Sequence, residues 1–116
     1  MGAEQFENIA PGNTAQEAFN AAYEDAAYDY GHAGYTGTIA EKSGFTLFHL
    51  AEGSDPRTVM DALSGWYDDD EKKEIVKAAL GNRAEEAAFL YDDKWGNAVC
   101  FPLGDGTFLF GGWASC

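Results

Sequence analysis

The stretch TAQEAFNAAYEDAAYDY, residues 14–30, decides the fold because it is the clearest element of the chain. Thr14, followed three residues later by Glu17, fits a capping box, in which the threonine caps the first turn and the glutamate reaches back. Apolar residues then recur at the spacing of one helix face, namely Ala15, Ala18, Phe19, Ala22, Tyr23, Ala26, Ala27 and Tyr30. Gly31 follows, where a left-handed C-cap favours glycine. The pattern predicts an amphipathic helix over residues 14–30.

The segments on either side of this helix are shorter and less regular. Residues 1–13 read as a lead-in strand or arm that ends at the turn signal Pro11-Gly12-Asn13. After the helix comes a glycine-dense loop, residues 31–38, and then two short strand candidates, Thr38 to Lys42 and Gly44 to Leu50.

The second half of the chain predicts more helices and a closing hairpin. Ser54 or Asp55 caps a helix that stops near Gly65, and the acids at 68–71 suit the start of the next helix. Residues 83–91 fit either a short helix or the start of a strand. Residues 98–103 and 107–110 flank Gly104-Asp105-Gly106 as the strands of a hairpin. We therefore expect a single α+β domain over residues 1–116, with a small antiparallel sheet packed against two or three helices.

Charge is the abnormal feature of the composition. The 116 residues include 20 acids and 7 bases, for a formal net charge of −13. Nucleic acids and anionic membrane surfaces carry the same sign, so direct binding to either is not expected. No apolar run approaches the roughly 20 residues of a membrane span. The first 13 residues lack the basic and apolar regions of a signal peptide, which favours the cytoplasm.

The sequence predicts neither a metal site nor a cofactor site. Asp68 to Glu71 lack the alternating spacing of a calcium loop, and the two histidines and two cysteines form no ligand motif. Gly31, Gly34 and Gly37 follow a helix, whereas phosphate-binding loops open one. Cys100 lies in an apolar strand, where buried packing is its expected role. No catalytic motif supports an enzyme.

The placement of the acids suggests a partner. Residues 1–41 contain seven acids and no lysine or arginine. Asp25 and Asp29 are four residues apart on the predicted helix, a rise of about 6 Å, and DNA carries one phosphate per roughly 3.4 Å on each strand. Such a surface can occupy a groove built for nucleic acid. The expected partner is a host protein with a basic nucleic-acid-binding surface, contacted by Glu17, Glu24, Asp25, Asp29, Asp68, Asp69, Asp70 and Glu71.

The glycine-dense loop, residues 31–38, supports an alternative function, either a protein that sequesters a small molecule or a modest enzyme. Its glycines would let the backbone approach a small molecule closely, while neighbouring side chains offer polar groups. The candidate ligand-binding residues are His32, Gly34, Tyr35, Thr36, Gly37, Thr38 and Glu41. The same loop also reads as a plain connector from helix to strand, with glycines at positions of positive φ.

The block GHAGYTGTIAEK, residues 31–42, resembles a block found in small, mostly uncharacterised proteins of tailed bacteriophages. In those proteins an alanine-rich helix runs into G-H-G-G-Y-T-G-T-I-A-E-K, and Ala33 is the one departure here. Residues 22–30, 94–96 and 110–115 agree with the same pattern. The resemblance implies a phage accessory protein acting in the bacterial cytoplasm. By analogy with other small acidic phage proteins, it implies an inhibitor of host defence of the anti-CRISPR or anti-restriction type.

Overall fold

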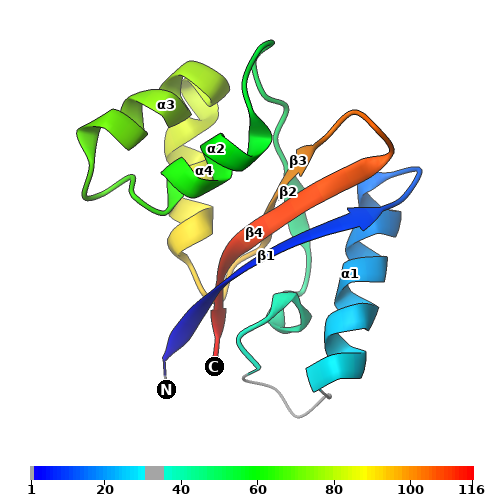
Figure 1. The fold of residues 1–116 in the computed structure, drawn as a ribbon. Coiled ribbons are helices and arrows are strands. Elements are labelled where there is room, and N and C mark those ends of the chain that lie inside the picture. Colours follow the sequence, from blue (N-terminus) through cyan, green and yellow to red (C-terminus); the bar gives the residue numbers. More distant parts are fainter. Residues whose placement is uncertain (1, 31–35) are drawn as a thin grey trace.

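A four-stranded sheet with helices on both faces forms the chain's architecture in the computed structural model, which describes residues 2–30 and 36–116 (Figure 1). The elements in chain order are β1 (Ala3–Pro11), α1 (Ala15–Tyr30), the 3-10 helix η1 (Ile39–Glu41), β2 (Phe45–Leu47), α2 (Pro56–Leu63), α3 (Asp70–Leu80), the 3-10 helix η2 (Gly81–Arg83), α4 (Ala84–Asp92), β3 (Ala98–Pro102) and β4 (Thr107–Ser115). This confirms the α+β class. The helices in the described part of the chain are too short or too polar to cross a bilayer.

Helix α1 begins as the capping pattern predicts. The backbone N–H of Glu17 donates to Thr14 Oγ1 at 3.2 Å, and Glu17 Oε1 accepts from the backbone N–H of Asn13 at 3.2 Å. The first bond satisfies a backbone donor that the first turn of a helix leaves without a partner, and the second satisfies the N–H of the residue before the cap. The predicted C-cap, Gly31, lies outside the described residues.

The strand order is β1-β4-β3-β2, so the last strand of the chain lies in the middle of the sheet. β4 pairs antiparallel with β1 and with β3, which confirms the closing hairpin. β2 pairs parallel with β3, so the sheet is mixed, whereas the sequence predicted an antiparallel one. The parallel pair arises because the chain crosses over through α2, α3 and α4 between these strands.

Two hydrophobic cores form on the two faces of the sheet. Helix α1 and η1 cover one face, and α2, α3 and α4 cover the other (Figure 1). Residues 98–101 of β3 are all buried, because Ala98 and Cys100 belong to the α1 core and Val99 and Phe101 to the opposite core. Burial on both faces explains why this strand reads as a continuous apolar run.

Four local expectations need correction or completion. The strand expected over 38–42 is wrong: the Thr38 side chain accepts a hydrogen bond from the Ala40 N–H at 3.2 Å and caps the 3-10 turn of η1. The strand expected over 44–50 shrinks to β2. The segment at 83–91, for which the sequence left two choices, is helical as α4, and Asp55 is the cap of α2.

Candidate functional site

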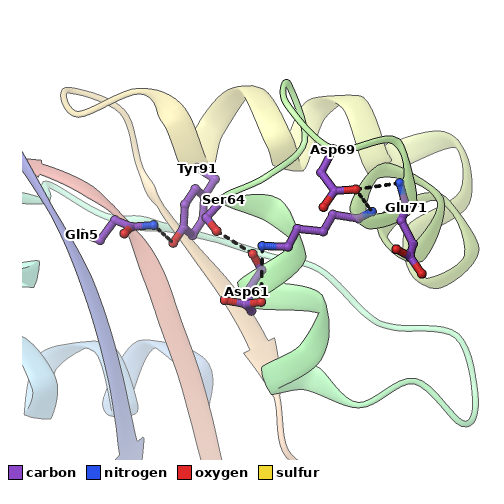
Figure 2. Close-up of polar contacts among 7 residues, drawn as sticks. Gln5, Asp61, Ser64, Asp69, Glu71 and Tyr91 are labelled. Carbon is purple, nitrogen blue, oxygen red and sulfur yellow. Dashed lines mark hydrogen bonds and ion pairs between the residues drawn. The ribbon is translucent and has the colours of Figure 1, made fainter.

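The acids at residues 68–71 serve the start of helix α3. Asp69 is its N-cap and accepts hydrogen bonds from the N–H groups of Glu71 and Lys72 at 2.9 and 3.4 Å (Figure 2). Asp70 and Glu71 occupy the first turn, where the helix dipole favours negative charge. Lys72, Lys73 and Lys77 follow on the same helix. Helix stability therefore accounts for Asp69, Asp70 and Glu71, and lysines on the same helix offset their charge.

The acids of α1 lack such a local explanation, apart from the capping residue Glu17. Glu24, Asp25 and Asp29 are exposed and make no hydrogen bond or ion pair with any other described residue. Asp29 lies in the last turn of α1, where the dipole opposes a negative charge and no basic residue compensates it. Asp25 is one turn away and adds like-charge repulsion. Among the described residues, no contact of the fold accounts for these carboxylates.

Asp25 and Asp29 line a groove of about 380 Å³ between α1 and β1. Residues 4–8 of β1 form its other wall, and residues 36–38 contribute Thr36, Gly37 and Thr38. The structure therefore brings together two sets of residues that the sequence assigned to different functions. It separates both sets from the acids at 68–71, which lie in the helical layer on the opposite face of the sheet (Figure 1).

The described part of the glycine-dense loop is held by its own hydrogen bonds. The Thr36 N–H and hydroxyl both donate to Glu41 Oε2, at 3.1 and 2.8 Å, and the Thr36 and Thr38 hydroxyl oxygens lie 2.8 Å apart. The Gly37 N–H donates to the Ser115 carbonyl at 2.8 Å. His32, Gly34 and Tyr35 lie outside the described residues. Residues 36–38 thus form one end of the groove, with Gly37 hydrogen-bonded to the last residues of β4.

Gly37 has a specific reason to be glycine. Its φ of 71° lies in the left-handed region, and a β-carbon there would come within 2.6 Å of Glu4 Oε2 and 3.2 Å of the Cys116 β-carbon. The carboxylate of Glu4 is therefore packed against the loop backbone, at the same groove that Asp25 and Asp29 line.

Sequence reasoning missed the groove residues of β1 and one aromatic of α1. Glu4, Glu7 and Asn8 join the site only because β1 lies beside α1. Tyr28, 89% exposed, stands on α1 one residue before Asp29. Tyrosine is enriched among the residues that dominate binding energy at protein interfaces. The sequence does show the acids of α1 and the alternation of polar and apolar residues in β1. Neither pattern indicates that β1 and α1 lie side by side.

Two described residues with shifted pKa values, Cys100 and Lys42, do not line this groove. Burial raises the pKa of the Cys100 thiol to about 12, so this cysteine is not a thiolate at neutral pH. Burial lowers the pKa of Lys42 to about 8, and its ammonium donates to the Asp93 carbonyl at 3.0 Å. Within the described ranges, no group of three or more His, Cys, Asp or Glu side chains is arranged to hold a metal ion. The groove offers carboxylates and hydroxyls, which suits recognition of a cation.

Comparison with known protein families, with curated proteins and with solved structures finds no match to this chain.

Proposed function

We propose that this protein is a non-enzymatic inhibitor that binds the basic, nucleic-acid-binding surface of another protein through the α1 side of its sheet. The observation that carries the proposal is the pair Asp25 and Asp29, two exposed carboxylates on a groove with no compensating base among the described residues. Glu4 of β1 lines the same groove, and Glu7 borders both this groove and the hollow on the opposite face of the sheet. A cationic surface would relieve the repulsion that the fold leaves in place.

The distribution of charge over the molecule supports this face over the other. All seven lysines and arginines follow residue 41, whereas residues 1–41 hold seven acids. Strand β1 and helix α1 therefore contain acids but no lysine or arginine, whereas the helical layer contains both signs. A field of one sign steers a basic partner toward that side and accelerates the encounter.

The resemblance of residues 31–42 to proteins of tailed bacteriophages supports the class of partner. A phage protein that acts in the bacterial cytoplasm meets nucleic-acid-binding defence enzymes, of which CRISPR effectors and restriction enzymes are examples. Their binding channels are lined with lysine and arginine because they hold phosphates. A negatively charged surface that enters such a channel excludes the nucleic acid.

A competition experiment tests the proposal. A tagged pull-down from bacterial lysate, eluted stepwise with salt, identifies the target, and fluorescence anisotropy then follows displacement of labelled duplex DNA from it. We expect wild-type protein to displace the DNA, with an affinity that falls steeply as salt rises. Asp25→Lys with Asp29→Lys should abolish displacement, and the matched pair Asp68→Lys with Asp70→Lys should preserve it. Equal activity of both double variants, or inhibition that persists at high salt, would contradict the proposal.

The groove also supports a second candidate function, which is sequestration of a small molecule. Thr36 and Thr38 line the same hollow as Asp25 and Asp29, an arrangement that fits a small amine. Extraction of the purified protein followed by mass spectrometry tests this function directly. A stoichiometric cationic metabolite, lost from the Asp25→Asn variant, would favour it over inhibition.

A further inference from the structure

Among residues 2–30 and 36–116, no strand pairs with the outer edge of β1. It is the terminal strand of the sheet and spans nine residues. The Gly12 N–H donates to the Gly106 carbonyl, and the Cys116 N–H donates to the Gly2 carbonyl. In an antiparallel pair, hydrogen-bonded residues alternate with residues whose N–H and C=O groups point away. The uniform register therefore turns the backbone groups of Ala3, Gln5, Glu7 and Ile9 outward.

Acids flank this edge on both faces of the sheet. On the α1 face, Glu4, Asp25 and Asp29 line the groove described above. On the opposite face, Glu7 and Asp61 line a second hollow of about 250 Å³. Figure 2 shows the hydrogen bond that the Gln5 amide donates to the Tyr91 hydroxyl, at 3.1 Å, and the half-exposed ion pair of Asp61 with Lys72, whose Nζ lies 3.8 Å from Asp61 Oδ2. Each face beside the edge therefore presents carboxylates.

We propose that the partner contributes an extended basic segment that adds to β1 as a fifth strand. This inference rests on the proposed function and specifies how the partner is recognised. Main-chain hydrogen bonds to Gln5, Glu7 and Ile9 would hold the segment, as in other cases of strand addition. Successive side chains of an added strand point to opposite faces. One set would meet Asp25 and Asp29, and the other set would meet Glu7 and Asp61.

The charge decides between this occupant and a second copy of the chain. Pairing β1 with β1 of another copy would place Glu4 and Glu7 of both copies along one edge, and like charges on neighbouring strands are destabilising. Two chains of net charge −13 also repel each other at long range. Lysine or arginine side chains on an added strand instead find an acid on either face.

Amide hydrogen exchange measured by NMR tests the inference on the unaltered protein. The probe is a ten-residue synthetic peptide of alternating lysine and threonine. In the free protein, the amides of Gln5, Glu7 and Ile9 should exchange much faster than those of Phe6, Asn8 and Ala10, which pair with β4. Saturation with the peptide should slow exchange at the first three residues by at least about tenfold, the effect expected of one net hydrogen bond.

A variant that removes one outward donor provides the second measurement. Proline is tolerated at an edge position whose N–H faces solvent, so Gln5→Pro leaves the pairing with β4 intact. Its control is Gln5→Ala, which also loses the bond to Tyr91 but keeps the backbone donor. By isothermal titration calorimetry, Gln5→Pro should weaken peptide binding at least about tenfold relative to Gln5→Ala.

The outcomes separate this inference from the proposed function. Peptide binding that leaves exchange at Gln5, Glu7 and Ile9 unchanged overturns strand addition, and so does the absence of peptide binding by a protein that still displaces DNA from its target. Neither result contradicts the proposal that Asp25 and Asp29 bind a basic surface. That proposal fails if reversing the charges of Asp25 and Asp29 leaves DNA displacement unaltered, or if inhibition persists at high salt.

Discussion

The ammonium group of Lys42 donates to the backbone carbonyl of Asp93 at 3.0 Å, and only 2% of the Lys42 surface is exposed. The bond joins the segment after η1 to the residue that caps the end of α4. A carbonyl neutralises no charge, so burial dominates and lowers the pKa of Lys42 to about 8, against the opposing effect of the nearby Asp93 carboxylate.

The first prediction is a pH dependence of stability that Lys42 causes. Between pH 8 and its ordinary pKa of 10.5, the unfolded chain binds more protons at this site than the native protein. The free energy of unfolding should therefore rise with pH across this window, by about 3 kcal/mol relative to Lys42→Met. Urea denaturation at several pH values measures the difference, and the exposed Lys77→Met controls for the loss of one charge. A difference that stays flat would mean that Lys42 titrates normally in the fold.

A second prediction concerns the cost of Asp29 to the fold. Removing its charge relieves both the helix dipole and the repulsion from Asp25, so Asp29→Asn should stabilise the protein by a few tenths to about 1 kcal/mol. Asp70→Asn, in the first turn of α3, should have the opposite sign. Thermal unfolding at low salt measures both. If Asp29→Asn destabilises, the carboxylate has a structural partner and its assignment to the binding face is wrong.

Helix α2 packs against β4 where the strand has no side chain. A β-carbon at Gly111 would lie 2.5 Å from the Met60 sulfur, and Met60 is 1% exposed. Gly111→Ala should therefore destabilise the protein by about 1–3 kcal/mol through overpacking. Combined with Met60→Ala, the two losses should be less than additive in a double-mutant cycle. Full additivity would show that the two residues do not share this space.

The two cysteines should differ in reactivity. Cys100 is fully buried with a pKa of about 12, whereas Cys116 is partly exposed. In native protein at pH 8, a chromogenic disulfide reagent should modify the Cys116 thiol quickly, and the Cys100 thiol only after unfolding. Mass spectrometry of the labelled peptides identifies the residue. Fast labelling of Cys100 would show that its thiol is accessible and reactive in the native protein, as a nucleophilic role requires.

The N-cap of α3 provides a last test of which acids stabilise a helix and which bind the partner. Asp69 accepts two backbone hydrogen bonds, so Asp69→Ala should cost about 1 kcal/mol of stability, whereas Asp68→Ala should cost much less. Neither change should affect partner binding, because both residues lie on the helical layer. Loss of DNA displacement by either folded variant would extend the binding face to α3.

The sequence predicts those parts of the fold that depend on neighbours along the chain. The capping box and apolar spacing of residues 14–30 determine α1, and the turn at residues 104–106 determines the hairpin. The parallel pairing of β2 with β3 depends on a crossover through three helices, which no local pattern specifies. The strand expected at 38–42 failed because the Thr38 side chain caps a 3-10 turn there.

The candidate site likewise contains residues that local sequence patterns identify and residues that only the folded structure reveals. Asp25 and Asp29 were identified because their helix is regular and their charges lack a local partner. Glu4 and Glu7 were missed, since their approach to α1 requires β1 to pair with β4, about a hundred residues further along the chain. The acids at 68–71 were included because they cluster in the sequence, although the start of a helix explains them.

The central position of β4 bears on how the protein is made. Because β1 pairs only with β4 within the sheet, residues 3–11 emerge from the ribosome long before their partner, residues 107–115, is synthesised. The N-terminal segment therefore waits with both strand edges unpaired, and the sheet closes only when the last strand inserts between β1 and β3. The carboxylates of Glu4 and Glu7 would protect that nascent strand from pairing with other chains during the delay.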